Sequence, residues 1–230
     1  MKIKLASKKI GAFLGAALSL TLANGEETVP VGWLEASPKL VRAGTYPNLE
    51  WEINYPVVEN LVTVPPDNTI VPLQELTMKV RILGASFQYS ATQYLYTQLW
   101  YKKNNGSWQN LWYGKQNQVN PSEVRYQTTV RADDTLYFGA RGYRSGWLPF
   151  YYSTDDSPNM IVLKDGDSVP SSRPAFYQGS IESFLQPYLD DNRVIDIGPR
   201  DVIILYELGQ TNPSSSGFDM QDLVALITFE

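Results

Sequence analysis

The chain of 230 residues carries 19 basic and 24 acidic side chains, for a net charge of −5, and contains neither histidine nor cysteine. The missing residue types exclude Ser-His-Asp and Cys-His catalysis, histidine metal sites and stabilising disulfides. The acidic balance argues against nucleic acid and anionic membrane surfaces as partners.

The first 25 residues have the pattern of an export signal. The apolar run Ile10–Leu22 is followed by the small residues Ala23 and Gly25. We expect cleavage between Leu22 and Glu26. The basic residues that open the signal are Lys2, Lys4, Lys8 and Lys9. The mature chain, residues 26–230, then has a charge of 15 minus 24, or −9. No later apolar run is long enough to cross a bilayer. We therefore expect a secreted, periplasmic or cell-surface protein with no integral membrane span once the signal is removed.

Residues 49–55 show the first clear strand pattern, in which Leu49, Trp51, Ile53 and Tyr55 alternate with polar residues. The surrounding segment, residues 37–56, reads SPKLVRAGTYPNLEWEINYP. It resembles the first two strands of immunoglobulin-like modules in exported bacterial proteins. The resemblance implies a sandwich fold and no particular activity. The proline-rich connection at 56–75 should cross an edge or an end of the sandwich, because proline cannot donate a hydrogen bond to a sheet.

The stretch Tyr94–Tyr113, YLYTQLWYKKNNGSWQNLWY, is the densest aromatic run and the clearest predicted β-hairpin. Asn104-Asn105-Gly106 lies between its two alternating arms, as is typical of a hairpin turn. A tight turn at Asn105-Gly106 pairs Trp100 with Leu111. A bulged turn, with Gly106 in the left-handed conformation, pairs Trp100 with Asn110 and Leu99 with Leu111.

The bulged register is favoured because it separates an aliphatic face from an aromatic one. The face that we assign to the core holds Leu95, Thr97, Leu99, Tyr101, Leu111 and Tyr113. The opposite face supplies the candidate ligand-binding residues Tyr94, Tyr96, Trp100, Trp108 and Trp112. Exposed rings on that face would stack on sugar rings, whereas covered rings would fill the core under 147–152.

Further strands are expected at 76–82, 124–130, 136–140, 147–152, 160–163, 202–208 and 223–229, with one short helix at Ser180–Leu189. This spacing predicts a single all-β domain, an antiparallel β-sandwich of immunoglobulin-like or jelly-roll-like type. Trp51, Leu99 and Leu226 are expected in its core.

Acidic side chains suggest two further kinds of site. Asp219 and Asp222, next to the polar loop 209–217, are the best candidates for Ca²⁺ ligands, although aspartates also cap turns. Glu50, Glu52 and Glu207 lie on predicted strands, where glycosidase carboxylates can lie. Arg141 and Arg144 lie in a loop with Tyr143 and could bind an anionic sugar or a partner's carboxylates.

These patterns favour an exported, non-catalytic protein that works by contact, as a structural or adhesive component of the cell surface or extracellular matrix. The alternative is a carbohydrate-binding protein that uses the aromatic face of 94–113, and a weaker one is a glycoside-active enzyme. Self-association or a cell-surface polysaccharide is the expected partner. Beyond calcium, no cofactor is expected.

Overall fold

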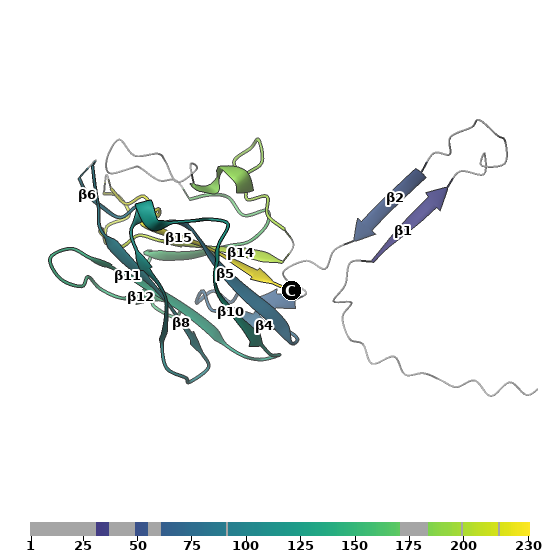
Figure 1. The fold of residues 1–230 in the computed structure, drawn as a ribbon, viewed down its shortest axis with the longest axis horizontal. Coiled ribbons are helices and arrows are strands. Elements are labelled where there is room, and N and C mark those ends of the chain that lie inside the picture. The colour runs from purple at the N-terminus through teal and green to yellow at the C-terminus, as the bar shows by residue number, and fades with distance from the viewer. Residues whose placement is uncertain are drawn as a thin grey trace, which may run out of the picture.

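The computed structural model describes residues 31–36, 49–54, 61–90, 92–170, 184–198, 200–215 and 217–230. Its elements are antiparallel strands and two short 3-10 helices, η2 at Gln116–Gln118 and η3 at Gln186–Tyr188 (Figure 1). The all-β prediction is confirmed. The predicted export signal lies outside the described residues, and in the described part no helix has the length and apolarity needed to cross a membrane.

A five-stranded sheet has the order β10-β5-β15-β14-β13. Its strands are β10 (Val124–Val130), β5 (Leu76–Gly84), β15 (Leu223–Phe229), β14 (Asp201–Tyr206) and β13 (Met160–Leu163). Strand β15 therefore lies between β5 and β14, which are its hydrogen-bonded neighbours.

A four-stranded sheet has the order β12-β11-β8-β9. Its strands are β12 (Tyr151–Tyr152), β11 (Leu136–Tyr143), β8 (Tyr96–Lys103) and β9 (Gln109–Gly114). The predicted 94–113 hairpin forms the β8–β9 half of this sheet, and β11 pairs with β8 along its whole length.

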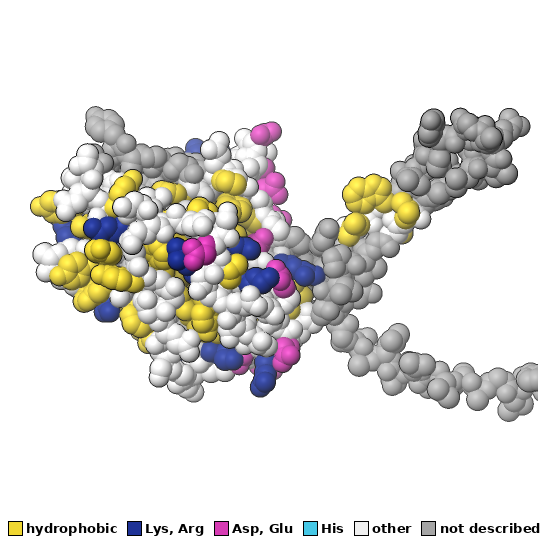
Figure 2. Space-filling view, viewed as in Figure 1, with side chains coloured by type: hydrophobic (Ala, Val, Ile, Leu, Met, Phe, Trp, Pro, Cys, Tyr) yellow, Lys and Arg dark blue, Asp and Glu magenta, His cyan; other side chains and the backbone are white. Residues whose placement is uncertain are grey.

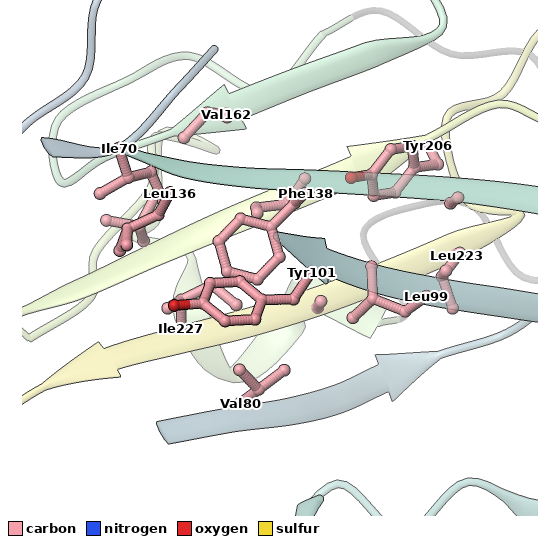
Figure 3. Close-up of a cluster of buried hydrophobic side chains, with 14 of the residues drawn as sticks. Ile70, Val80, Leu99, Tyr101, Leu136, Phe138, Val162, Tyr206, Leu223 and Ile227 are labelled. Carbon is pink, nitrogen blue, oxygen red and sulfur yellow. The ribbon is translucent and has the colours of Figure 1, made fainter. Parts of the chain in front are cut away.

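The main core lies between these two sheets. Tyr101 and Phe138 from the four-stranded sheet meet Val80 and Ile227 from the five-stranded sheet (Figure 3). Leu99 is fully buried in the same cluster, as predicted. The alternation of buried and half-buried residues along β5 and β8 shows that each strand turns one face to the core.

The opposite face of the five-stranded sheet is covered as well. Leu83, Leu205 and Leu226 pack there against Leu185 and Ile195 in a second apolar cluster. This explains why β14 and β15 are almost continuously apolar, and it confirms Leu226 as buried. The predicted helix at Ser180–Leu189 is represented in the described residues by η3, whereas residues 180–183 lie outside them.

The prediction that Trp51 lies in the core is wrong. Strands β1 (Val31–Ala36) and β2 (Leu49–Asn54) pair with each other, and Figure 1 draws this hairpin apart from the two main sheets. Among the described residues no sheet packs on this hairpin: Trp51 is 67% exposed, and Leu34, its partner across the hairpin, is exposed too. Alternation identified the strand but not what covers it.

The described part of the proline-rich connection, 61–75, folds back on the sandwich. It forms the short pair β3 (Val62–Thr63) and β4 (Val71–Pro72), and Ile70 exchanges backbone hydrogen bonds with Leu136 beside them. Leu61 and Ile70 are buried in the main core, which fixes this connection against one end of the sandwich.

Candidate functional site

The register of the β8–β9 hairpin decides which aromatic rings face outward. Trp100 pairs with Asn110, as the bulged register predicts, but Leu99 pairs with Trp112 instead of Leu111. The register shifts between these pairs and leaves Leu111 as the extra residue of a β-bulge. The pairs beyond the bulge, from Leu99–Trp112 to Thr97–Gly114, therefore follow the register that the tight turn predicts.

Because of this bulge, two residues lie on the face opposite to the predicted one. Trp112 lies on the core side, only 5% exposed, and its Nε1 donates to Thr97 Oγ1 at 3.2 Å. Tyr113, assigned to the core, is 53% exposed instead. A one-residue slip exchanges the two faces of a strand, which is why both errors occur together.

The turn also differs from the prediction. Asn104, with φ of 52°, takes the left-handed conformation that was assigned to Gly106. The Asn104 side chain accepts from Thr135 N–H at 2.7 Å and donates to Asp134 at 2.7 Å, which ties the turn to the start of β11. Asparagine tolerates this conformation better than most residues.

Tyr94 does not join the candidate site. It belongs to a separate small hairpin, β6 (Gln88–Ser90) with β7 (Gln93–Tyr94), and pairs with Gln88. The outward rings therefore come from β8, β9, β11 and β12, from the turn between β8 and β9, and from the loop before β12. We call this surface the aromatic face, and it consists of Tyr96, Trp100, Trp108, Tyr113, Tyr143, Trp147, Phe150 and Tyr152.

The rings of the aromatic face contact one another in two groups. Tyr96 stacks on Tyr113 at 4.8 Å between centroids, and Trp147 lies 6.2 Å from Tyr113 and 5.2 Å from Tyr143. Trp108 meets the edge of Phe150 at 5.0 Å in the second group. Such pairs hold aromatic side chains in fixed orientations.

A pocket of about 270 Å³ lies beside the second group, lined by Trp100, Trp108, Arg141 and Phe150. Gln98 on β8, which pairs directly with Arg141 on β11, organises this pocket. Its Oε1 accepts from Trp100 Nε1 at 3.1 Å and from Arg141 Nε at 2.8 Å. The pocket thus combines three rings with a cation held in place by a hydrogen bond.

A glycine makes room for this arrangement. Gly139 on β11 pairs with Trp100 on β8 and with Tyr152 on β12. A Cβ atom at this position would come within 2.5 Å of Phe150 Cζ. The missing side chain lets the Phe150 ring lie directly over the sheet.

The second candidate site is a buried acidic cluster. Asp219 and Asp222 are brought together with Glu207, and their carboxylate oxygens lie within 4.8 Å of one another. Oxygen ligands at this spacing fit the preferences of Ca²⁺, so these three residues are the ones that would hold it. Calcium binding stays a prediction.

Backbone N–H groups already surround the cluster. Glu207 Oε1 accepts from Gly209 and Gln210, both at 2.8 Å, while Asp222 Oδ2 accepts from Leu208 at 2.7 Å. Burial raises the pKa of Asp222 well above its usual range, and the nearby charges of Glu207 and Asp219 raise it further. The cluster therefore holds the 207–222 connection together and favours the protonated form of Asp222.

Of the three strand carboxylates considered for glycosidase chemistry, the side chains of Glu207 and Glu52 are described, and they lie on different parts of the structure. Glu207 is 1% exposed and accepts three backbone hydrogen bonds, the third from Asp219 N–H at 3.0 Å. Glu52 lies on the separate β1–β2 hairpin, where it accepts from Trp33 Nε1 at 3.3 Å.

Sequence reasoning missed part of the aromatic face. Trp147 and Phe150 were treated as a cover for the rings, whereas they extend the surface, and Trp147 is 43% exposed. Arg141 was considered only as a loop residue, but it lies in β11, opposite Gln98. A signal for these residues was present, because 135–154 contains six aromatic side chains besides Phe138 and no acidic one.

Comparison of the chain with protein-family models, curated proteins and solved structures found no match.

Proposed function

We propose that the protein is a non-catalytic carbohydrate-binding β-sandwich whose aromatic face stacks on sugar rings. We also propose that the protein is exported and acts at a cell surface or in an extracellular matrix. The observation that carries it is the set of mutually supported, outward rings around a pocket lined by Trp100, Trp108 and Phe150.

The energetics of the surface support a binding role. Tyr113, Tyr143 and Trp147 are each at least 40% exposed and lie in one chain of contacts. Soluble proteins seldom expose contiguous apolar patches of this kind without a partner. The five-stranded sheet covers its outer face with a second cluster, whereas the four-stranded sheet keeps its outer rings accessible.

The polar groups beside the rings fit a sugar better than a purely apolar ligand. A pyranose has an apolar face made of C–H groups and a rim of hydroxyls. Rings can stack on the first, while Gln98, Arg141 and Lys102 offer hydrogen bonds at the rim of the pocket.

The alternative of self-association through strand edges has less support. The strand nearest the C-terminus, β15, is paired on both sides. The edge strands β9 and β10 each carry a bulge or register shift, a feature that discourages edge-to-edge pairing. The exposed β1–β2 hairpin is the feature that most favours contact with another chain.

Native gel electrophoresis in gels that contain one polysaccharide each tests the proposal. We expect at least one polysaccharide to retard the wild type, and Trp108→Ala and Trp147→Ala to abolish the retardation. Trp51→Ala removes an exposed tryptophan outside the aromatic face and should bind as the wild type does. Equal retardation of the wild type and Trp108→Ala would refute the proposed site.

A further inference from the structure

We propose that the aromatic face selects sugar rings that carry an oxyanion, either a carboxylate or a sulfate, and that Arg141 binds that group. This inference rests on the proposed function, because it names the class of saccharide that the same pocket takes.

Arg141 is positioned before any ligand arrives. Its Nε donates to Gln98 Oε1 at 2.8 Å, and its Cζ lies 4.3 Å from the centroid of the Trp147 ring and 5.6 Å from that of Trp100. One edge of the guanidinium is thus occupied by Gln98 and its faces are flanked by indoles. The Nη groups remain as donors at the pocket that Arg141 lines.

The charge of Arg141 has no protein counterpart. Within the part of the chain that the structure describes, Arg141 forms no ion pair, although it is half-buried. A partly desolvated cation gains most from an anion that it can bind in a bidentate way, and the guanidinium fork matches carboxylate and sulfate oxygens. A neutral hydroxyl would leave that charge unbalanced.

The surroundings of Arg141 are basic in a chain that is acidic overall. Residues 96–114 and 136–152, which hold the strands of the four-stranded sheet, contain four Lys or Arg and no Asp or Glu, against 24 acidic residues in the whole chain. Lys102 lies 4.2 Å from the Tyr137 ring and 5.2 Å from the Trp108 ring, so a second cation borders the aromatic face.

The surface view shows where the acidic side chains lie. Figure 2 shows hydrophobic side chains gathered on the left of the main body, where Figure 1 places β11 and β12, with basic side chains among them, whereas the acidic side chains lie toward the middle and right. A net negative protein does not attract a polyanion non-specifically, so binding to one requires such a local site.

Two matched pairs of probes test the inference by native affinity electrophoresis. Polygalacturonate is compared with its methyl ester, which keeps the sugar backbone and loses the carboxylate charge. Dextran sulfate is compared with dextran, which lacks the sulfate. We expect the wild type to bind the charged member of at least one pair about tenfold or more tightly, as loss of a charge-assisted hydrogen bond implies. The pair that shows the preference identifies the anion.

Variants of Arg141 give the decisive comparison. Arg141→Gln should remove the preference while leaving residual stacking affinity, and Arg141→Lys should keep part of it, because the charge remains without the fork. Arg131→Gln is the matched control, since Arg131 is an exposed arginine that lies 3.4 Å from Glu75 outside the pocket. Thermal melting of each variant confirms folding.

The outcomes separate the inference from the proposed function. Equal binding of the charged and neutral members, or an equal effect of Arg131→Gln and Arg141→Gln, overturns the inference and leaves carbohydrate binding intact. Unchanged charge preference in Arg141→Gln also overturns it. Absence of binding to any polysaccharide, including neutral ones, overturns both.

Discussion

Replacement of Asp222 by asparagine should make the protein more stable at neutral pH while changing little in acid. Burial, followed by the charges of Glu207 and Asp219, raises the pKa of Asp222 well above its usual value. The protonated carboxyl can donate to Glu207, and its Oδ2 accepts from Leu208 and Gly209 at 2.7 and 3.1 Å. The asparagine amide copies this pattern, because its oxygen can accept and its nitrogen can donate.

The sign and size follow from proton linkage. The folded chain keeps the proton at pH values where the unfolded chain, with an aspartate pKa of about 3.9, has released it. The contribution to stability is therefore full below about pH 4 and is lost as the pH rises toward the folded-state pKa. For one proton, the free energy of unfolding falls by up to about 1.4 kcal/mol per pH unit across this window.

Urea unfolding followed by tryptophan fluorescence, between pH 4 and pH 8 with EDTA present, measures the effect. The difference in unfolding free energy between Asp222→Asn and the wild type should be small at pH 4 and should grow with pH. Asp156→Asn, which removes an exposed carboxylate, controls for the change in net charge. A difference that stays constant with pH, or an Asp222→Asn protein less stable than the wild type at pH 8, would refute the reasoning.

The remaining predictions concern the core, the aromatic face and calcium. Leu99→Ala and Trp112→Ala should each lower the unfolding free energy by about 2–5 kcal/mol in urea titrations, because both side chains are buried. A smaller loss for Trp112→Ala than for Trp108→Ala would contradict the bulge at Leu111, which turns Trp112 to the core. Gly139→Ala should weaken polysaccharide retardation, because the new methyl group displaces the Phe150 ring, and unchanged retardation would show that this ring is not needed. The calcium prediction requires millimolar calcium chloride to raise the melting temperature above its value in EDTA, and Asp219→Asn to remove that rise.

Much of the fold follows from local pattern. Residues 76–82 and 124–130 were identified as strands from alternation and turn signals, and both lie within or match strands of the five-stranded sheet. Leu99 was placed correctly because β8 alternates strictly from Tyr96 to Tyr101. Such signals depend on neighbours in sequence, which is the information that a single chain contains.

The errors arise where distant parts of the chain decide. Trp51 has the alternation of a half-buried strand, but in the part of the chain that the structure describes no second sheet packs on its hairpin. Trp112 and Tyr113 exchanged faces because Leu111 forms a bulge, which a hairpin sequence does not specify by itself. Glu207 and Asp219 are 12 residues apart in sequence. Their side chains come together only because the connection between β14 and β15 folds back on itself.

The central place of β15 sets the order in which the sandwich can assemble. Strand β5 is complete by Gly84, yet one of its two neighbours in the sheet begins only at Leu223. Contacts so far apart in sequence close long loops and slow the search for the native state. During synthesis β5 therefore emerges long before β15 is made, with one edge unpaired, and the five-stranded sheet closes last.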